Sequence, residues 1–165
     1  MTGITSVWHV GFSVSNLERS IAFYRDGLGL VLHHRQTGDN PYTRTLVGYP
    51  DAIIHVAQFV IEGVEPPPSG HVLELIEYEQ PQGEHLEPSN ARIGSGHLAF
   101  TVDAIDEAAR RVTEHGGVLL SEPVDITAGI NTGGRAVYLR DPDGITLELL
   151  QPPHKKAQHG RSILD

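Results

Sequence analysis

Two stretches of the chain, 88 residues apart, carry the same pattern: WHVGFSVSNLERSIAFYRDGLGLVL (8–32) and GHLAFTVDAIDEAARRVTEHGGVLL (96–120). Aligned without a gap, they place His9 on His97 and Gly29 on Gly117. A second pair, GHVLELI (70–76) and GITLELL (144–150), matches at an offset of 74 residues. A fixed spacing of this kind indicates an internal repeat. The chain is therefore two copies of one unit, the first longer by 14 residues (88 minus 74).

Each unit is predicted to contain one strand, one helix and three further strands. The opening stretches, 7–14 and 97–102, alternate in hydrophobicity with the period of two that is typical of a strand. Apolar residues at helical spacing follow in both units. The later β-rich stretches are 30–35, 52–61 and 72–78 in the first unit, and 118–121, 135–140 and 145–150 in the second.

Local signals mark the ends of these elements. Ser15 with Glu18 predicts a capping box at the start of the first helix, and Asp103 with Asp106 a weaker one at the second. The segment Asp141-Pro142-Asp143-Gly144 predicts a hairpin turn between the last two strands, because proline fits its first corner and glycine tolerates positive φ.

The pattern predicts an α+β fold in which two βαβββ modules form an incomplete barrel around a metal site. The first module covers 4–79 and the second 94–152, joined by a polar linker at 80–93 that contains proline and glycine. The tail, 153–165, has no periodicity. The extra residues of the first module are expected in loops at 36–51 or 65–70, which are rich in turn-forming residues.

Composition narrows the chemistry and the partners. The chain has no cysteine, so any metal must be bound by imidazole and carboxylate groups. The formal net charge of −9 argues against a nucleic-acid partner. No apolar run approaches the roughly 20 residues that cross a bilayer, and the N-terminus lacks the pattern of a secretory signal. We expect a cytoplasmic protein that binds neither nucleic acid nor membrane.

Four residues related by the repeat predict a metal site. His9 and His97 occupy equivalent positions on the first strand of each unit, and Glu74 and Glu148 on the last strand. Each glutamate stands between two leucines, where burial of a lone carboxylate is costly unless a cation compensates it. A single histidine or glutamate is usually an ordinary surface or core residue. The symmetry of all four favours a divalent metal ion bound to His9, Glu74, His97 and Glu148.

Four segments, HVGFSVSNLERSIAFYRDGLGL, LELIEY, GHLAFTVDAID and YLRDPDGITLEL, together resemble the vicinal oxygen chelate superfamily. This superfamily includes glyoxalase I, methylmalonyl-CoA epimerase, extradiol dioxygenases, fosfomycin-resistance enzymes and bleomycin-binding proteins. The resemblance covers roughly residues 4 to 152 and is specific for the fold and the metal position, not for the reaction. Glyoxalase I-like members carry His, Glu, His and Glu at the four metal positions, which matches His9, Glu74, His97 and Glu148. Epimerases commonly have glutamine at the position of Glu74.

The resemblance implies a glyoxalase I-like lyase or isomerase that depends on a divalent metal ion (Zn, Ni, Co, Mn or Fe). Its reaction would be proton transfer next to a carbonyl of a small-molecule substrate, with the metal polarising two adjacent oxygens. Glu74 or Glu148 would leave the metal and act as the general base. Arg19, Arg35 and Arg44 are possible anchors for a glutathione carboxylate, although no residue set marks such a site.

Two alternatives stay open. The resemblance to extradiol dioxygenases implies Fe(II) on His9, His97 and Glu148, with Tyr138 as a catalytic tyrosine and His55 as a further possible acid or base. A small-molecule or antibiotic-binding protein of the bleomycin-resistance type is the third hypothesis. The complete set of four ligands counts against it, because bleomycin-binding members lack that set. We also expect a homodimer, since association would cover exposed sheet edges.

Overall fold

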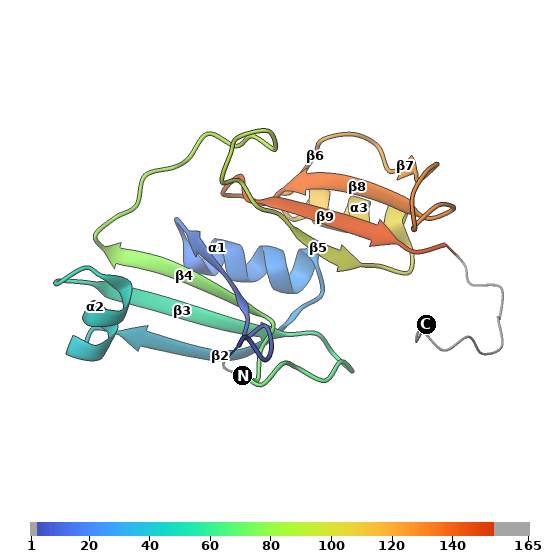
Figure 1. Ribbon diagram of the computed structural model, residues 1–165. Coiled ribbons are helices and arrows are strands. Elements are labelled where there is room, and N and C mark those ends of the chain that lie inside the picture. Colours follow the sequence, from blue (N-terminus) through green and yellow to red (C-terminus); the bar gives the residue numbers. More distant parts are fainter. Residues whose placement is uncertain (1–2, 154–165) are drawn as a thin grey trace.

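The computed structural model describes residues 3–153 of the 165-residue chain. The first module forms a four-stranded sheet in the order β1-β4-β3-β2, with β1 parallel to β4 and the other pairs antiparallel (Figure 1). Its elements are β1 (Val10–Val14), α1 (Leu17–Ala22), the π-helical segment η1 (Phe23–Gly27), β2 (Val31–Gly38), α2 (Pro41–Val47), β3 (Ile53–Val60) and β4 (Leu73–Gln80).

The second module repeats this arrangement in a five-stranded sheet of order β5-β9-β8-β6, with β7 paired to β8. Strand β5 runs parallel to β9, as β1 does to β4. Its elements are β5 (Leu98–Thr101), α3 (Ile105–Glu114), β6 (Val118–Leu119), β7 (Val124–Asp125), β8 (Arg135–Arg140) and β9 (Thr146–Gln151). Two open sheets with helices confirm the predicted α+β class.

One apolar core joins the two modules. Leu73 and Leu75 of β4 and Leu147 and Leu149 of β9 are fully buried in the same cluster as residues of α1, η1 and α3. Helix α3 also contacts η1 directly, since the Arg111 Nε donates to a carbonyl oxygen of η1 at 2.8 Å. Because side chains alternate along a strand, the residues between those leucines point away from the core.

The hairpin turn between β8 and β9 anchors the second module on the first. The Tyr24 hydroxyl donates to Asp141 at 3.1 Å. The Ser15 hydroxyl and the Arg19 guanidinium each donate to Asp143 at 2.6 Å. The turn that the sequence predicts for chain reversal therefore also carries the polar contacts between modules.

The predicted capping boxes are wrong. The N-cap of α1 is Asn16, whose side chain accepts from the Arg19 N–H at 2.9 Å, while Ser15 is engaged by Asp143. The last strand of each module supplies a second cap. Glu77 of β4 accepts from the first N–H of α1 at 2.6 Å, and Gln151 of β9 accepts from that of α3 at 2.9 Å. The Asp103 box does not form, because the N-cap of α3 is Ala104, which has no side chain that could accept a hydrogen bond.

The loop expected at 36–51 contains a helix. Asn40 caps the start of α2 by accepting from the Thr43 N–H at 3.0 Å, Pro41 fills the first helical turn, and Gly48 ends the helix at φ +79°. Asparagine, proline and glycine are common at these positions of a helix. The prediction of a loop was wrong because the same residues are also common in turns. Strand β1 is also shorter than expected and begins at Val10, because its partner β4 begins only at Leu73.

Within residues 3–153, no helix is long and apolar enough to cross a membrane. The predicted tail at 153–165 lies outside the described residues except for its first residue.

Candidate metal centre

The N-terminal half of the candidate centre lies where β1 and β4 run side by side. His9 directly precedes β1, and Glu74 is the second residue of β4. The His9 Nε2 lies 3.9 Å from the Glu74 Oε1. The parallel pairing places Gly11 opposite Glu74. His9 is two positions before Gly11, so its side chain lies on the same face of the sheet. The repeat thus brings this histidine and this glutamate together.

A third side chain joins this pair. His71 lies just before β4 and is only 4% exposed. Its Nε2 is 3.6 Å from the Glu74 Oε2, and its ring stacks on that of His9 with centroids 4.7 Å apart. Potential ligand atoms of His9, His71 and Glu74 all lie within 4.8 Å of one another, as a shared metal ion requires. His71 was not predicted from the sequence, because the repeat pairs it with Ile145, whose side chain cannot bind a metal ion.

The C-terminal half lies at the equivalent place between β5 and β9. The His97 Nε2 is 3.3 Å from the Glu148 Oε2. The Tyr138 hydroxyl lies 3.4 Å from the same nitrogen of His97, and the two rings meet edge to face. Burial, together with the neighbouring Glu148 carboxylate, raises the pKa of Tyr138. Tyr138 therefore remains a neutral phenol at physiological pH.

Each glutamate faces a different polar residue on the neighbouring strand. Gln58 of β3 lies opposite Glu74 and donates from Nε2 to its Oε2 at 2.9 Å. Tyr138 of β8 lies opposite Glu148. Gln58 was not predicted from the sequence. Its signal is a polar side chain among the apolar residues of the stretch AIIHVAQFV. The two halves thus share ligand types and differ in what orients them.

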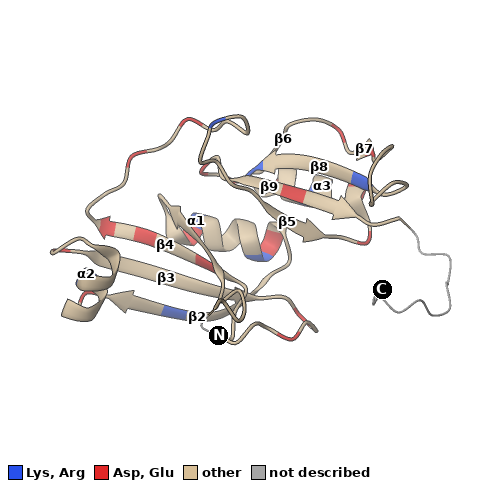
Figure 2. Ribbon diagram, viewed as in Figure 1, with Lys and Arg blue, Asp and Glu red and all other residues tan. Residues whose placement is uncertain are grey.

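Within the described residues, the two halves form no common group of metal ligands. Among residues 3–153, no group of three potential ligands within 4.8 Å combines His97 or Glu148 with His9 or Glu74. Figure 2 shows acidic residues on β4 and on β9, which belong to separate sheets. Glu74 and Glu148 both alternate with core leucines, so they occupy the sheet faces turned away from the shared core.

The N-terminal half suits a divalent metal ion. The His71 Nε2 is buried and has no hydrogen-bond partner in the described part of the chain. An unsatisfied buried polar atom costs about 1–3 kcal/mol, which coordination to a cation would recover. Imidazole with carboxylate is a donor set used by Zn, Ni, Co, Mn and Fe. These residues therefore fit the predicted cofactor.

Other residues that the sequence singled out lie elsewhere. His55 bonds Thr37 at 3.1 Å and Glu79 at 2.7 Å, and its odd spacing from Gln58 places it on the opposite face of the sheet from Glu74. His55 therefore lies apart from His9, His71 and Glu74 in this structure. The three arginines considered as anchors are paired: Arg19 with Asp143, Arg35 with Glu18 and Arg44 with the Ala52 carbonyl.

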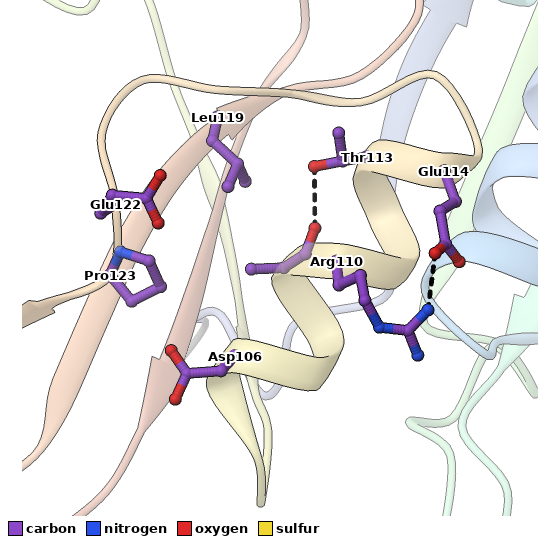
Figure 3. Close-up of a pocket in the computed structure, with 8 residues that line it drawn as sticks. Asp106, Arg110, Thr113, Glu114, Leu119, Glu122 and Pro123 are labelled. Atoms are coloured by element: carbon purple, nitrogen blue, oxygen red, sulfur yellow. Dashed lines mark hydrogen bonds and ion pairs between the residues drawn. The ribbon is translucent and has the colours of Figure 1, made fainter.

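A surface hollow of about 380 Å³ lies between α3 and the β6–β7 connection (Figure 3). Several of its polar groups are paired locally. Arg110 pairs with Glu114 at 2.6 Å, Thr113 bonds the Ala109 carbonyl at 2.8 Å, and Asp106 pairs with Arg135 at 2.5 Å. The hollow shares no residue with either histidine–glutamate pair, so we do not assign it to the centre.

Comparison with known proteins identifies the family of the chain. A family model described as the Glyoxalase/Bleomycin resistance protein/Dioxygenase superfamily matches residues 6–149. A 2-epi-5-epi-valiolone epimerase from Actinomyces sp is 32% identical over 155 residues, which are 92% of this chain and 81% of that protein. A lactoylglutathione lyase from Salmonella typhimurium is 31% identical over 150 residues, covering 87% of this chain and 90% of that protein.

Solved structures show the same fold. A glyoxalase family protein from Bacillus cereus superposes with a TM-score of 0.75 at 24% identity, covering 92% of this chain and 97% of that one. A fosfomycin resistance protein from Listeria monocytogenes, complexed with Mn(II) and sulfate, gives a TM-score of 0.59 at 18% identity, with 93% and 98% covered. The curated relatives are enzymes of the lyase and isomerase classes. The chain belongs to the glyoxalase/bleomycin resistance protein/dioxygenase superfamily, as its glyoxalase I-like histidine and glutamate pattern predicts.

Proposed function

We propose that the protein is a glyoxalase I-like lyase or isomerase that depends on a divalent metal ion and transfers a proton next to a carbonyl of a small-molecule substrate. The repeated histidine–glutamate pair, at 3.9 Å in one module and 3.3 Å in the other, carries this proposal. The similarity of the chain to a lactoylglutathione lyase and to an epimerase supports the same reaction class, since the two names describe a lyase and an isomerase.

His9, Glu74, His97 and Glu148 would hold the ion. When bound there, a divalent metal polarises the substrate oxygens and stabilises the negative charge that develops on proton loss. The donor set suits Zn, Ni, Co, Mn or Fe.

The residues around the two glutamates favour Glu148 as the general base. The Gln58 amide holds Glu74 by a direct hydrogen bond, which fixes that carboxylate in place. At the equivalent position beside Glu148 stands Tyr138, whose hydroxyl lies against His97. Glu148 would therefore be freer to turn toward the substrate and take its proton at a carboxylate oxygen.

We also propose that two copies of the chain build each centre. The two pairs lie on sheet faces turned away from the shared core, so a second copy is needed to bring one pair opposite the other. Strands β1 and β5, which adjoin the two histidines, are edge strands of their sheets and are open to further association. A twofold dimer would then contain two equivalent centres.

Metal content and substrate preference test the reaction. The purified protein would be dialysed against chelator, reloaded with each metal, and assayed with hemithioacetal, acyl-CoA and catechol substrates. We expect about one ion per chain and turnover of a substrate with a proton next to a carbonyl. A protein that binds no metal and turns over none of these compounds would instead be a small-molecule-binding protein.

Subunit complementation tests the shared centre. One variant would lack the N-terminal pair (His9→Ala/Glu74→Ala) and the other the C-terminal pair (His97→Ala/Glu148→Ala). Each alone should be inactive. After subunit exchange, a mixed dimer contains one intact centre, so about a quarter of wild-type activity should return. If no activity returns although sedimentation shows mixed dimers, the centre is not shared.

One observation favours a second candidate function. The Tyr138 hydroxyl lies beside His97, where an extradiol dioxygenase would use a tyrosine. In that case His9, His97 and Glu148 would bind Fe(II). Oxygen uptake with catechols after anaerobic loading with Fe(II) would support this alternative.

A further inference from the structure

We infer that His71 is a third metal-binding side chain of the N-terminal half, so that His9, His71 and Glu74 hold the ion within a single chain. The inference rests on the proposed metal-dependent function and adds a ligand to it. It also changes how the centre would assemble, because the N-terminal half would then bind metal before a second subunit contributes.

The backbone determines which nitrogen of His71 is available. Its Nδ1 lies 3.2 Å from the Ser69 carbonyl oxygen. A carbonyl oxygen only accepts, so Nδ1 must carry the proton, and the Nε2 of the neutral ring presents a lone pair. Metal-binding histidines are commonly oriented in this way, with the outer N–H donated to a backbone carbonyl.

The free nitrogen of His71 points at a negative group. It lies 3.6 Å from the Glu74 Oε2, which is too far for a direct hydrogen bond. A lone pair and a carboxylate oxygen that face each other are both acceptors. A cation between them would turn this repulsion into two favourable contacts.

The two histidines are held side by side by the main chain around them. The Ser69 hydroxyl bonds the Trp8 carbonyl and lies 2.7 Å from the His71 carbonyl. The Val10 N–H donates to the Val72 carbonyl at 3.1 Å, which fixes the residues that directly follow each histidine. Both His9 and His71 also carry a buried nitrogen without a partner among the described residues. The site is thus built by the fold and does not depend on flexible side chains.

The repeat makes the N-terminal half different from the C-terminal half. The residue equivalent to His71 is Ile145, so the second module offers only His97 and Glu148. Each complete centre would therefore receive three ligands from one subunit and two from its partner. The first set is sufficient for a stable metal site in the free subunit, since three protein ligands are common in catalytic zinc sites.

Zinc affinity of full-length variants tests this assignment. His71→Gln would be introduced into the wild-type protein and into the His97→Ala/Glu148→Ala variant, and zinc affinity measured by competition with a chromophoric chelator. We expect the His97→Ala/Glu148→Ala variant to keep zinc, and His71→Gln to weaken zinc binding at least about tenfold in both backgrounds. His55→Gln is the matched control, because His55 lies in the same module on the opposite sheet face, and it should leave the affinity unchanged.

The outcomes separate this inference from the proposed function. If the wild-type protein binds neither zinc nor any of the other divalent ions named for the centre (Ni, Co, Mn and Fe), both are overturned, and if it binds one of those in place of zinc, the same variants are compared with that ion. If wild type binds zinc but His71→Gln does not weaken it, or if the His97→Ala/Glu148→Ala variant loses zinc entirely, only the inference is overturned. Should His71→Gln fail to fold, X-ray absorption of the zinc-loaded wild type decides, since the inference requires the imidazole of His71 in addition to those of His9 and His97.

Discussion

The hydroxyl of Tyr24, in the first module, donates a hydrogen bond at 3.1 Å to the carboxylate of Asp141, in the second. Both side chains are buried. Burial raises the pKa of the Asp141 carboxyl, against the opposing effect of its hydrogen bonds from Ile145, Asp143 and Tyr24. Burial and the Asp141 carboxylate raise the pKa of the Tyr24 hydroxyl as well. This contact is a polar joint inside the apolar core that unites the modules.

Replacement of Tyr24 by phenylalanine should destabilise the whole chain. The Asp141 Oδ2 would lose the partner recorded for it in the core, at a cost of about 1–3 kcal/mol in the free energy of unfolding. Urea denaturation followed by circular dichroism measures this change. Tyr42→Phe is the control, because Tyr42 is 72% exposed on α2 and should unfold like wild type. Equal stability of both variants would contradict the structural role of the joint.

The lowered pKa of Asp143 makes the stability of the protein depend on pH. Burial opposes ionisation of its carboxyl, but the bonds from Ser15 and Arg19 outweigh it and lower the pKa below the ordinary 3.8. A carboxyl whose pKa is lowered on folding stabilises the protein above its unfolded pKa, and this contribution disappears as the pH falls through its folded pKa. Asp141 has the opposite sign: because its pKa is raised on folding, it lowers stability as the pH rises from its unfolded pKa to its higher folded pKa.

Asp143→Asn should therefore reduce the free energy of unfolding near pH 7 and reduce it less toward about pH 2. Urea titrations at a series of pH values measure the difference between variant and wild type. The two proteins should converge in acid. A difference that stays constant over the whole range would show that the Asp143 charge does not contribute.

The helix caps provide a prediction with an internal control. Glu77 accepts from the first N–H of α1, and Gln151 does the same for α3, so an amide is sufficient for this role. Glu77→Gln should change stability little, whereas Glu77→Ala should cost about 0.5–2 kcal/mol through loss of the cap. Thermal melts of the three proteins separate the two effects. If Glu77→Gln is as damaging as Glu77→Ala, the charge matters more than the bond.

Two substitutions at the candidate centre distinguish the proposed reactions. Glu74→Gln should reduce turnover by about a hundredfold or more in a proton-transfer enzyme, because it removes a metal-binding carboxylate, while Tyr138→Phe should do little. A dioxygenase should show the reverse pattern. Steady-state kinetics on the best substrate, with metal content measured in parallel, provides the comparison. Catechol cleavage with oxygen uptake that survives Glu74→Gln would contradict the lyase or isomerase proposal.

Much of this fold could be predicted from the sequence because the internal repeat shows the same spacing of apolar residues twice. The sequence showed that Glu74 and Glu148 each stand between two leucines, and the structure shows that these leucines are buried. His71 was not predicted because it lies outside the strands and the equivalent residue of the second module is an isoleucine. Helix α2 was not predicted because asparagine, proline and glycine are common both in loops and at helix ends. Only the structure shows that these residues mark the ends of a helix here.

The placement of the two halves was also beyond the sequence. The repeat shows that His9 and His97 occupy equivalent positions, but not whether the two equivalent sheet faces of one chain meet. That depends on how α1, η1 and α3 pack, and their contacts are set by the three-dimensional fit of side chains such as Arg111 against η1. The homodimer therefore remains a prediction, supported by the separation of the pairs within the chain.

The core shared by both sheets has a consequence for how the two modules fold. The helices of the two modules bury their apolar faces in one cluster, so a module produced alone would leave half of that cluster in water. The repeated sequence is a unit of duplication but not a unit of folding. A single module would need a second copy to cover its helices, and the repeat supplies that copy within the same chain. The chain is then expected to unfold in one cooperative step, with no stable half-folded form.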